Sequence, residues 1–533
     1  MTIPGMMQRT PLTLSLVFDR LRTVYADGRI ADVEGETTYG AFADRVLRLA
    51  RVLTEELGVR PGDRVATFGS NSVRHLEVYY AVPLIGAVLH TVNVRLSDDQ
   101  IAYIVDHAED RVLFVDGALV DQLAAIAPRL TTVERFVRMG SGPSEGLPGL
   151  VDHDELVAAA VPYDDLRPVD EDAALGLCYT SGTTGNPKGV LSSHRGMVLH
   201  SLATCMADHI GLRESDVVLP IVPMFHAFAW GLPFAAPLTG SGMVFHGADS
   251  SAGHLGEVIA SQGVTVAGAV PTIWKDLLPG LRAGSIDAAT LRLVFVGGAA
   301  SPRALIEAYD QLGIEYLQVW GMTETGPLAC ASRPRRRHAG LSHGQLLDVR
   351  ERTGTIFAGL EARITDADGG ELPRDGSSVG ELEVRGPWIA SGYYGVDASE
   401  RFNDGWLRTG DVAAMERDGE FRIVDRAKDL VKSGGEWISS VELEGHLLAH
   451  PQVADAAVVG VPSQRWDERP LAVLVAADAT DPPTLASVRD FLAERVVRWW
   501  LPDAIELVDE IPKTSVGKLD KKVIRGQLDV VLD

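Results

Sequence analysis

The feature that most constrains the fold is a loop rich in glycine and hydroxyl residues, placed directly after an apolar run. The apolar run covers Ala173–Tyr179, and the loop continues as Thr180-Ser-Gly-Thr-Thr-Gly-Asn-Pro-Lys188-Gly. A short apolar run is typical of a buried strand, and the stretch from His194 is predicted to be helical. A strand, a flexible loop and a helix in this order indicate an α/β domain.

The residue types of this loop are those that bind a polyphosphate. Gly182 and Gly185 let backbone N–H groups approach a bulky anion closely, and Lys188 adds a positive charge. Hydroxyl donors are supplied by Ser181, Thr183 and Thr184. The loop is not a Walker motif, because no Gly-Lys pair is followed by Ser or Thr at the required spacing. Exposed turns use the same residue types, but so dense a mixture after a buried strand favours a phosphate site.

The loop resembles the signature of the adenylate-forming superfamily, which includes acyl-CoA synthetases, peptide-synthetase adenylation domains and luciferases. The resemblance covers nearly the whole chain and is closest to the bacterial fatty acyl-CoA synthetases. It extends to further segments in the same order, namely Val222–Trp230, Gln318–Thr325, Asp425–Leu430, Lys432–Ser440 and Ile511–Lys518. It implies that a carboxylate attacks the α-phosphorus of ATP to give acyl-AMP and pyrophosphate, and that the thiol of CoA then displaces AMP.

Composition narrows the possible partners. The 533-residue chain has a net charge of −24, which would repel nucleic acid, so no nucleic-acid partner is expected. The basic run Arg333–His338 is interpreted as a solvated loop, with contact to the phosphates of CoA as the less favoured alternative. Three cysteines without short spacing predict neither a disulfide framework nor a zinc site.

The N-terminal sequence and the apolar runs bear on location. Met1–Leu14 lacks a basic start followed by an apolar core, so no secretory signal is expected. The longest apolar run, Val78–His90, is too short to span a bilayer. We therefore expect a cytoplasmic protein without an integral membrane segment.

The predicted architecture is α/β, with a large N-terminal domain of layered α/β subdomains and a small, mobile α+β C-terminal domain. Short apolar runs alternate with helical segments up to about Gly410. Val412–Glu416 and Glu420–Val424 flank Asp418-Gly419, which predicts a hairpin. We place the boundary between residues 425 and 426, giving domains 1–425 and 426–533, with a short hinge at Lys428.

A second loop is predicted to follow a strand end. Leu293–Val296 reads as a strand, and Ser301 is predicted to cap a helix that begins at Pro302 and runs towards Leu312. Tyr316–Trp320 is predicted to be the next strand. Loops after strand ends are where open α/β sheets bind ligands.

By resemblance, the residues around these strand ends bind ATP. One wall of the adenine slot is assigned to Gly298, Ala299 and Ala300, and the other to Gln318, Val319, Trp320 and Gly321. The family usually has Gly at position 319 and Tyr at position 320. The indole of Trp320 can stack on adenine, and core packing of this residue stays open as an alternative. Asp411 resembles the acid that accepts the ribose hydroxyls.

The resemblance also assigns the charged residues of the reaction. Glu324 and Thr180 are expected to hold Mg²⁺, and Thr323 to lie near the phosphates. Arg426 is expected to contact the nucleotide, and Lys428 a phosphate. Lys518 is the expected catalytic lysine, whose ammonium would bridge the substrate carboxylate and the α-phosphate.

The thiol and acyl sites complete the set. The segment expected to line a tunnel for the pantetheine arm of CoA contains Lys432, Gly434, Gly435 and Trp437. His226 is expected to border the substrate carboxylate, and Trp230 to gate an apolar pocket. The small domain would then present Lys518 for adenylation and Gly434 for thioester formation, rotating at Lys428 between the steps.

The sequence therefore predicts an acyl-CoA synthetase, an acid–thiol ligase that uses ATP, Mg²⁺ and CoA on an apolar carboxylic acid, as a homodimer. An adenylating enzyme that loads a carrier-protein thiol, or stops at acyl-AMP, is one alternative. An inactive nucleotide-binding regulator is another, although Lys188, Glu324, Asp411 and Lys518 together argue against it.

Overall fold

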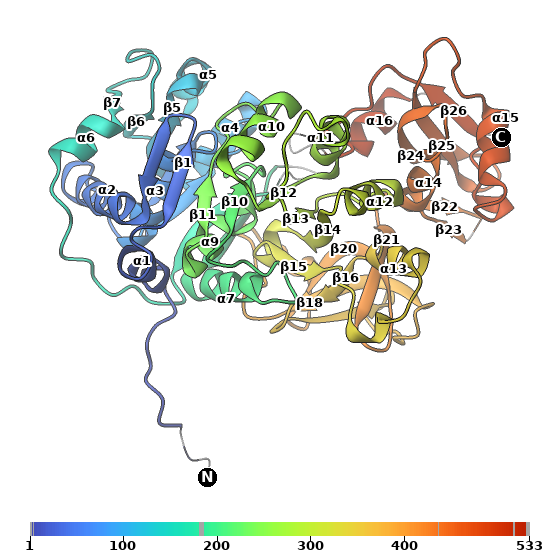
Figure 1. Ribbon diagram of the computed structural model, residues 1–533, viewed down its shortest axis with the longest axis horizontal. Helices are drawn as coiled ribbons and strands as arrows, with labels where there is room; N and C mark the ends of the chain where they lie inside the picture. Colours follow the sequence, from blue (N-terminus) through green and yellow to red (C-terminus); the bar gives the residue numbers. More distant parts are fainter. Residues whose placement is uncertain (1–2, 4, 181–185, 435, 515–517, 529–533) are drawn as a thin grey trace.

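The computed structural model describes residues 3, 5–180, 186–434, 436–514 and 518–528. It is a mixed α/β structure with a large N-terminal domain and a smaller C-terminal domain rich in β-strands, as predicted. In Figure 1 the small domain, coloured orange to red, lies at one end of the long axis, and the first helices lie at the other end.

The first sheet of the large domain is parallel, with one antiparallel strand at its edge. Its order is β7-β6-β5-β3-β4-β8-β9. The strands are β3 (Arg64–Phe68), β4 (Val88–Thr91), β5 (Asp110–Asp116), β6 (Arg135–Met139), β7 (Val151–Asp152), β8 (Ala174–Tyr179) and β9 (Gly189–Ser193). Continuous apolar runs such as Leu113–Val115 are buried on both faces, as parallel strands require.

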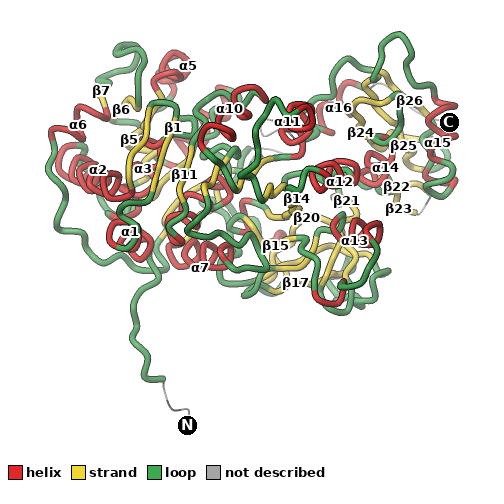
Figure 2. The backbone as a smooth tube through the Cα atoms, viewed as in Figure 1, coloured by secondary structure: helices red, strands yellow, loops and turns green. Residues whose placement is uncertain are grey.

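The second sheet joins a parallel half to an antiparallel half, and its yellow strands cross the centre of Figure 2. Its order is β17-β18-β20-β21-β16-β15-β14-β13-β12-β10-β11-β1-β2, with β19 paired to β20. The parallel half and its antiparallel edge strand β2 comprise β1 (Arg29–Asp32), β2 (Gly35–Thr38), β10 (Val217–Pro220), β11 (Gly242–Val244), β12 (Val266–Ala269), β13 (Leu293–Val296) and β14 (Glu315–Gly321). The antiparallel half comprises β15 (Leu328–Ala331), β16 (Gly354–Ile356), β17 (Glu361–Thr365), β18 (Val379–Arg385), β19 (Phe402–Asn403), β20 (Trp406–Met415) and β21 (Glu420–Arg426).

Helices connect these strands. They are α1 (Leu14–Thr23), α2 (Tyr39–Arg51), α3 (Val73–Leu84), α4 (Asp98–Ala108), α5 (Val120–Ile126), α6 (His153–Ala159), α7 (His194–Cys205), α9 (Leu232–Thr239), α10 (Ala252–Gln262), α11 (Pro271–Ala283), α12 (Arg303–Gln311) and α13 (His343–Arg350). Side-chain caps fix several starts; for example, Ser97 and Gln100 form a capping box at α4. Among the described residues, no helix is long and apolar enough to cross a bilayer.

The helix predicted from His194 is confirmed as α7, which Ser193 caps. Two details differ from expectation. Between the phosphate loop and α7, Gly189–Ser193 forms β9, which pairs antiparallel with β8. The helix predicted to begin at Pro302 is α12, which begins at Arg303. The Ser301 hydroxyl accepts a hydrogen bond from Tyr316 instead of capping this helix. The predicted turn at Asp418-Gly419 does join β20 to β21.

The small domain has its own sheet and its own core. The sheet order is β23-β22-β25-β24 with β26 on β25, and its strands are β22 (Val431–Ser433), β23 (Glu436–Ile438), β24 (Val453–Ser463), β25 (Asp467–Ala476) and β26 (Ala504–Leu507). Its helices are α14 (Ser440–Leu447), α15 (Leu485–Leu492) and α16 (Lys521–Gln527). Residues such as Val431, Leu443 and Val488 form a cluster with no member from the large domain among the described residues. The chain leaves the large sheet after Arg426 and enters the small one at Val431.

Candidate active site

A cavity of about 1820 Å³ lies where the strand ends of the large domain face the small domain. Most of the predicted site residues that the structure describes line it. They are Thr180, Lys188, His226, Trp230, Gly298, Ala299, Ala300, Gln318, Val319, Trp320, Gly321, Thr323, Glu324, Asp411, Arg426, Lys428 and Lys518. The predicted residues Ser181, Gly182, Thr183, Thr184 and Gly435 lie outside the described residues.

The phosphate loop is anchored at both ends. At its base, the Thr180 N–H donates to the carbonyl of Lys188 at 2.9 Å. At its far side, Tyr394 pairs with Gly189, and its N–H donates to the Gly189 carbonyl at 2.8 Å. The hydroxyl of Tyr179, just before the loop, lies 2.7 Å from Nδ1 of His107. The hairpin therefore holds Thr180 and Lys188 at the cavity edge.

Glu324 is a buried carboxylate held by a tyrosine that the sequence analysis did not identify. The Tyr393 hydroxyl donates to Oε1 of Glu324 at 2.6 Å. Burial, together with the neighbouring carboxylate, raises the pKa of Tyr393. The ammonium of Lys188 lies 5.2 Å from the centre of the same ring and 3.8 Å from Oε1 of Glu400. Tyr393 thus links the lysine of the phosphate loop to Glu324.

The loop that carries Glu324 is fixed by its own backbone and by Thr325. Thr323–Thr325 form one turn of 3₁₀-helix after β14. The Thr325 hydroxyl accepts from the N–H of Met322 at 2.8 Å and donates to the carbonyl of Pro327 at 2.6 Å. No cluster of three or more His, Cys, Asp or Glu suited to a metal is present in the described parts of the chain. One carboxylate beside hydroxyl groups suits Mg²⁺ that arrives with phosphate ligands.

Trp320 and Asp411 are joined by a direct hydrogen bond. The indole N–H of Trp320 donates to Oδ2 of Asp411 at 2.8 Å, and Nε of Arg426 lies 3.5 Å from Oδ1. The indole also packs edge-on against Phe421 at a centroid distance of 5.9 Å. Trp320 therefore orients the carboxylate expected to bind ribose, a role absent from the sequence analysis. The sequence left adenine stacking and core packing open as alternatives for Trp320. The indole is buried in the core and also lines the cavity, so it has features of both.

Lys518 of the small domain lies close to the opposite wall at Gly298. Gly298 has φ +87°, and a Cβ placed there would lie 3.3 Å from Cε of Lys518. Gln318 lines the cavity and also supports this wall through its side-chain amide. Its Oε1 accepts from the N–H of Ser301 at 3.3 Å, and its amide nitrogen lies 3.4 Å from the carbonyl of Glu351.

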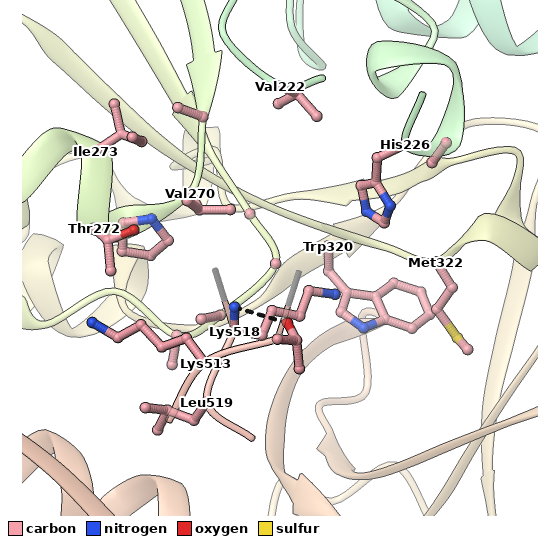
Figure 3. Close-up of a pocket in the computed structure, with 18 of the residues that line it drawn as sticks. Val222, His226, Val270, Thr272, Ile273, Trp320, Met322, Lys513, Lys518 and Leu519 are labelled. Atoms are coloured by element: carbon pink, nitrogen blue, oxygen red, sulfur yellow. Dashed lines mark hydrogen bonds between the residues drawn. The ribbon is translucent and has the colours of Figure 1, made fainter. Parts of the chain in front are cut away.

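Lys518 reaches into the cavity from the small domain. In Figure 3 its side chain extends towards Trp320, with His226 on the far side of the same space. Loss of hydration, assisted by the cationic Arg426, lowers the pKa of Lys518 to about 8. Burial, with a contribution from Lys518, lowers the pKa of His226 to about 3, so this imidazole is neutral at pH 7. Lys518, Arg426 and Lys428 bring three cationic side chains to this part of the cavity, which suits the phosphates of a polyanionic ligand.

The side of the cavity that contains Trp230, where the acyl group is expected, is closely packed. The indole of Trp230 lies 5.9 Å from the ring of Phe295, and both side chains are buried. A Cβ on Gly297 would lie 3.3 Å from the Trp230 indole and 3.0 Å from Cγ2 of Val319. Trp230 and Val319 therefore occupy the space next to Gly297.

The segment that carries Trp230 has an unusual backbone. Ala227, Phe228, Ala229 and Trp230 have φ between 45° and 56°, followed by Gly231 at 77°. This turn, α8 (Ala227–Trp230), is left-handed, which costs about 1–2 kcal/mol per residue for side chains other than glycine. The backbone of this turn is strained and its side chains are buried. The surrounding packing, rather than local backbone preference, therefore holds Trp230 in the pocket.

The segment expected to face CoA lies away from the cavity. Lys432, Gly434 and Trp437 are absent from the cavity lining as described and belong to the β22–β23 hairpin at the end of the small domain (Figure 1). The Lys432 ammonium lies 5.3 Å from the centre of the half-exposed Trp437 ring. The structure thus brings Lys518 to the site and leaves the second predicted face outside it.

The basic run is engaged in ion pairs within the large domain. Arg333 lies 2.6 Å from Glu315, Arg335 lies 3.2 Å from Asp418, and Arg337 pairs with Glu420. These contacts tie the run to the carboxylates of neighbouring strands and turns.

Comparison with known proteins agrees with this geometry. Residues 19–394 match the family described as AMP-binding enzyme, and residues 442–518 match the AMP-binding enzyme C-terminal domain. The 3-methylmercaptopropionyl-CoA ligase of Ruegeria pomeroyi is 43% identical over 537 residues, covering 99% of each chain. The long-chain-fatty-acid–CoA ligase of Thermus thermophilus is 45% identical over 495 residues, covering 92% of this chain and 90% of the relative.

The fold has a solved counterpart. The crystal structure of the anthranilate–CoA ligase AuaEII in complex with anthranoyl-AMP superposes with a TM-score of 0.86 at 25% identity, covering 97% of this chain and 98% of the other. The chain therefore belongs to the AMP-binding enzyme family, and it is an ATP-dependent acyl-CoA synthetase, an acid–thiol ligase that works through an acyl-AMP intermediate.

Proposed function

We propose that this enzyme activates a short, apolar carboxylic acid and that the described structure corresponds to the adenylation step. The observation that carries the proposal is the position of Lys518, which enters the cavity that also contains Glu324, Asp411 and the base of the phosphate loop. A cation at this position would neutralise the repulsion between a carboxylate and the α-phosphate.

In the first step, a carboxylate oxygen of the acid forms a bond to the α-phosphorus, and the bond from that phosphorus to pyrophosphate breaks. Lys518, Lys188 and Arg426 would stabilise the charge on the phosphates, while Asp411, oriented by Trp320, would accept the ribose hydroxyls. In the second step, the CoA sulfur bonds to the acyl carbon and AMP leaves. Neutral His226 would border the acyl carboxylate without adding a charge.

Glu324 and Thr180 are proposed to hold Mg²⁺ that arrives bound to ATP. Mg²⁺ takes few protein ligands and keeps phosphate oxygens and waters, and when bound it would neutralise charge on the phosphates. The Tyr393 hydroxyl fixes one oxygen of Glu324, so the carboxylate is oriented before the ligand enters. No described observation favours the carrier-protein or regulatory alternatives over transfer to CoA.

The proposed acid is short because the space beside Gly297 is filled. Trp230 packs on Phe295, and Val319 replaces the glycine that the family usually has at this point. We infer that these two bulky side chains limit the length of the acid that binds beside His226. The relative from Ruegeria pomeroyi is named for a short thioether acyl group, which supports the same size class, whereas the relative from Thermus thermophilus is named for long-chain acids.

A screen tests the acid and the lysine together. Pyrophosphate release would be measured with ATP, Mg²⁺ and linear acids of graded length, with aromatic and polycyclic acids included. We expect kcat/KM to be highest for acids of about six carbons or fewer, and Trp230→Ala to move the optimum to longer acids. A wild-type optimum at long or polycyclic acids would refute the size class. Lys518→Ala should abolish pyrophosphate release with every acid, and unchanged release would refute the role of Lys518.

The remaining proposals concern the whole protein. The boundary between residues 425 and 426 and a lid that moves about Lys428 are supported by the change of sheet after Arg426. A homodimer in the cytoplasm is supported by the family resemblance alone. Analytical ultracentrifugation at micromolar concentration would test the dimer, and a monomer would refute it.

A further inference from the structure

A series of four buried polar groups, three of them ionisable, lies at the joint between the two domains. It comprises Asp425 near the end of β21, Ser440 and Glu444 on α14, and Lys521 at the start of α16. Their exposed fractions are 1%, 0%, 7% and 8%. Such groups are rarely buried unless each one is paired, so their arrangement requires an explanation.

The four groups are hydrogen-bonded in series. Oδ2 of Asp425 accepts from both the N–H and the hydroxyl of Ser440, each at 2.6 Å. The ammonium of Lys521 donates to the same hydroxyl at 2.6 Å and lies 2.7 Å from Oε1 of Glu444. The Ser440 hydroxyl thus accepts a hydrogen bond from Lys521 and donates one to Asp425, so it bridges the ammonium and the carboxylate.

Only one member of the series belongs to the large sheet. Asp425 is on β21, whereas Ser440, Glu444 and Lys521 move with the small domain if the lid rotates at Lys428. A second bond crosses the joint beside it, from the Ser439 hydroxyl to the carbonyl of Val424 at 2.6 Å. The N-terminus of α14 is therefore docked on the end of β21 (Figure 1), where its dipole favours the Asp425 carboxylate.

The same series fixes the segment that carries the catalytic lysine. Lys521 is three residues beyond Lys518, and α16 begins at Lys521. The loop before it is closed by the Lys518 N–H, which donates to the Thr514 hydroxyl at 3.2 Å, and by the Thr514 N–H, which donates to the Lys518 carbonyl at 2.7 Å. Holding Lys521 against Ser440 therefore sets the direction from which Lys518 enters the cavity.

We propose that Asp425 is a positioning residue for Lys518: through Ser440 and Lys521 it latches the lid in the orientation used for adenylation, and the latch opens before thioester formation. The inference rests on the proposed role of Lys518. When the lid rotates, the bonds among Ser440, Lys521 and Glu444 stay within the small domain. The bonds to Asp425 and Val424 cross the joint and break, as does the bond from the Lys275 ammonium to the Ala454 carbonyl at 2.7 Å. Removing the Asp425 charge should therefore weaken one lid orientation without disturbing the other.

The two half-reactions would be measured separately on the full-length enzyme. Acyl-AMP formation would be followed by pyrophosphate release without CoA, using the best acid of the screen above. Thioester formation would be followed from the synthetic acyl-AMP of that acid and CoA. We expect Asp425→Asn to slow acyl-AMP formation about tenfold and to leave thioester formation within about twofold, because a hydrogen bond to a charged group is lost in one orientation only.

Two further variants keep the test decisive. Ser440→Ala removes the bridging hydroxyl and should show the same asymmetry, which covers the case in which Asp425→Asn does not fold. Thr484→Ala is the matched control, because Thr484 caps α15 inside the small domain by accepting from the N–H of Ser487 at 3.1 Å. It should leave the ratio of the two half-reactions unchanged.

Equal losses in both half-reactions, or no loss in either, would overturn the latch. Lys518→Ala in the same assays separates this failure from failure of the proposed function. If Lys518→Ala abolishes acyl-AMP formation while Asp425→Asn and Ser440→Ala do not slow it, only the latch is wrong. If Lys518→Ala leaves acyl-AMP formation intact, the role assigned to Lys518 is wrong and the latch fails with it.

Discussion

At the scale of single residues, the site consists of charged side chains whose neighbours are set by the packing of the fold. Burial lowers the pKa of Lys518, as do the neighbouring cations Arg426 and Lys428, so its charged form is disfavoured until an anion binds. Glu324 and Asp411 each accept a hydrogen bond at one carboxylate oxygen, from the Tyr393 hydroxyl and the Trp320 indole N–H respectively. The cations are thus poised for phosphate, while the carboxylates are held in place.

The lowered pKa of Lys518 predicts a pH dependence of adenylation. The ammonium is charged below a pKa of about 8 and loses its proton as the pH rises through that value. We expect kcat/KM for ATP, measured by pyrophosphate release without CoA, to fall about tenfold per pH unit above that point. Bound ATP should raise the pKa, so kcat should fall only at higher pH. A kcat/KM that stays constant to pH 10 would contradict the assignment.

The contact between Tyr393 and Glu324 predicts a role in binding ATP with its metal. Tyr393→Phe removes the donor that orients the carboxylate, and the loss of a hydrogen bond to a charged group should lower kcat/KM for ATP about tenfold. Titration of the ATP–Mg²⁺ complex by calorimetry should show weaker binding as well. Tyr394→Phe is the control, because its ring packs edge-on against His107 instead. Equal effects of the two variants would count against an orienting role.

At the scale of secondary-structure elements, the local sequence pattern predicted the buried strands better than the segments that connect them. The runs Ala173–Tyr179 and Leu293–Val296 are buried strands because both faces are covered, and a continuous apolar run records this. The return strand β9 was missed because Gly189–Ser193 is short and half polar, so only its pairing with β8 makes it a strand. Pro302 was placed inside a helix that begins one residue later, an error typical of element ends.

The left-handed turn before α9 was not predictable from local preference. Its residues are Ala227, Phe228, Ala229 and Trp230, none of which favours a positive φ. Packing of Phe228 and Trp230 in the core must outweigh the local strain, and packing of this kind depends on residues distant in sequence. The motif resemblance located Trp230 at the pocket, but the left-handed backbone conformation of its segment is seen only in the structure.

This turn predicts an unusual response to glycine. Ala229→Gly should be neutral or stabilise the protein by up to about 1 kcal/mol, because relief of the left-handed strain offsets the greater freedom of the unfolded chain. Ala235→Gly, in the right-handed α9 and equally buried, should destabilise by about 1 kcal/mol. Thermal unfolding of both variants checks this. A Tm for Ala229→Gly as low as that for Ala235→Gly would show that the turn is not strained.

At the scale of the whole molecule, the sequence predicted two domains with different tasks but not how their surfaces meet. The motif residues Lys518, Glu324 and Asp411 all line one cavity, and each was found because it belongs to a recognisable segment. Tyr393 and Asp425 were not given roles, because their partners, Glu324 and Ser440, lie far along the chain or across the joint. The long sheet that joins β14 to β21 also has an order that no local pattern encodes.

The position of the β22–β23 hairpin predicts that one face of the small domain serves only the second half-reaction. Gly434 has φ +60°, and a Cβ there would lie 3.1 Å from the rings of both Trp466 and Trp499, so Gly434→Leu should distort the hairpin locally. Acyl-AMP formation should stay within about twofold, because the hairpin lies outside the described cavity, while thioester formation should fall about tenfold or more. Gly419→Leu is the control for backbone strain, since Gly419 has φ +83° with no heavy atom within 4 Å. If Gly434→Leu slows both half-reactions equally, the hairpin is a structural element of one rigid enzyme, and a lid that turns between two tasks is ruled out.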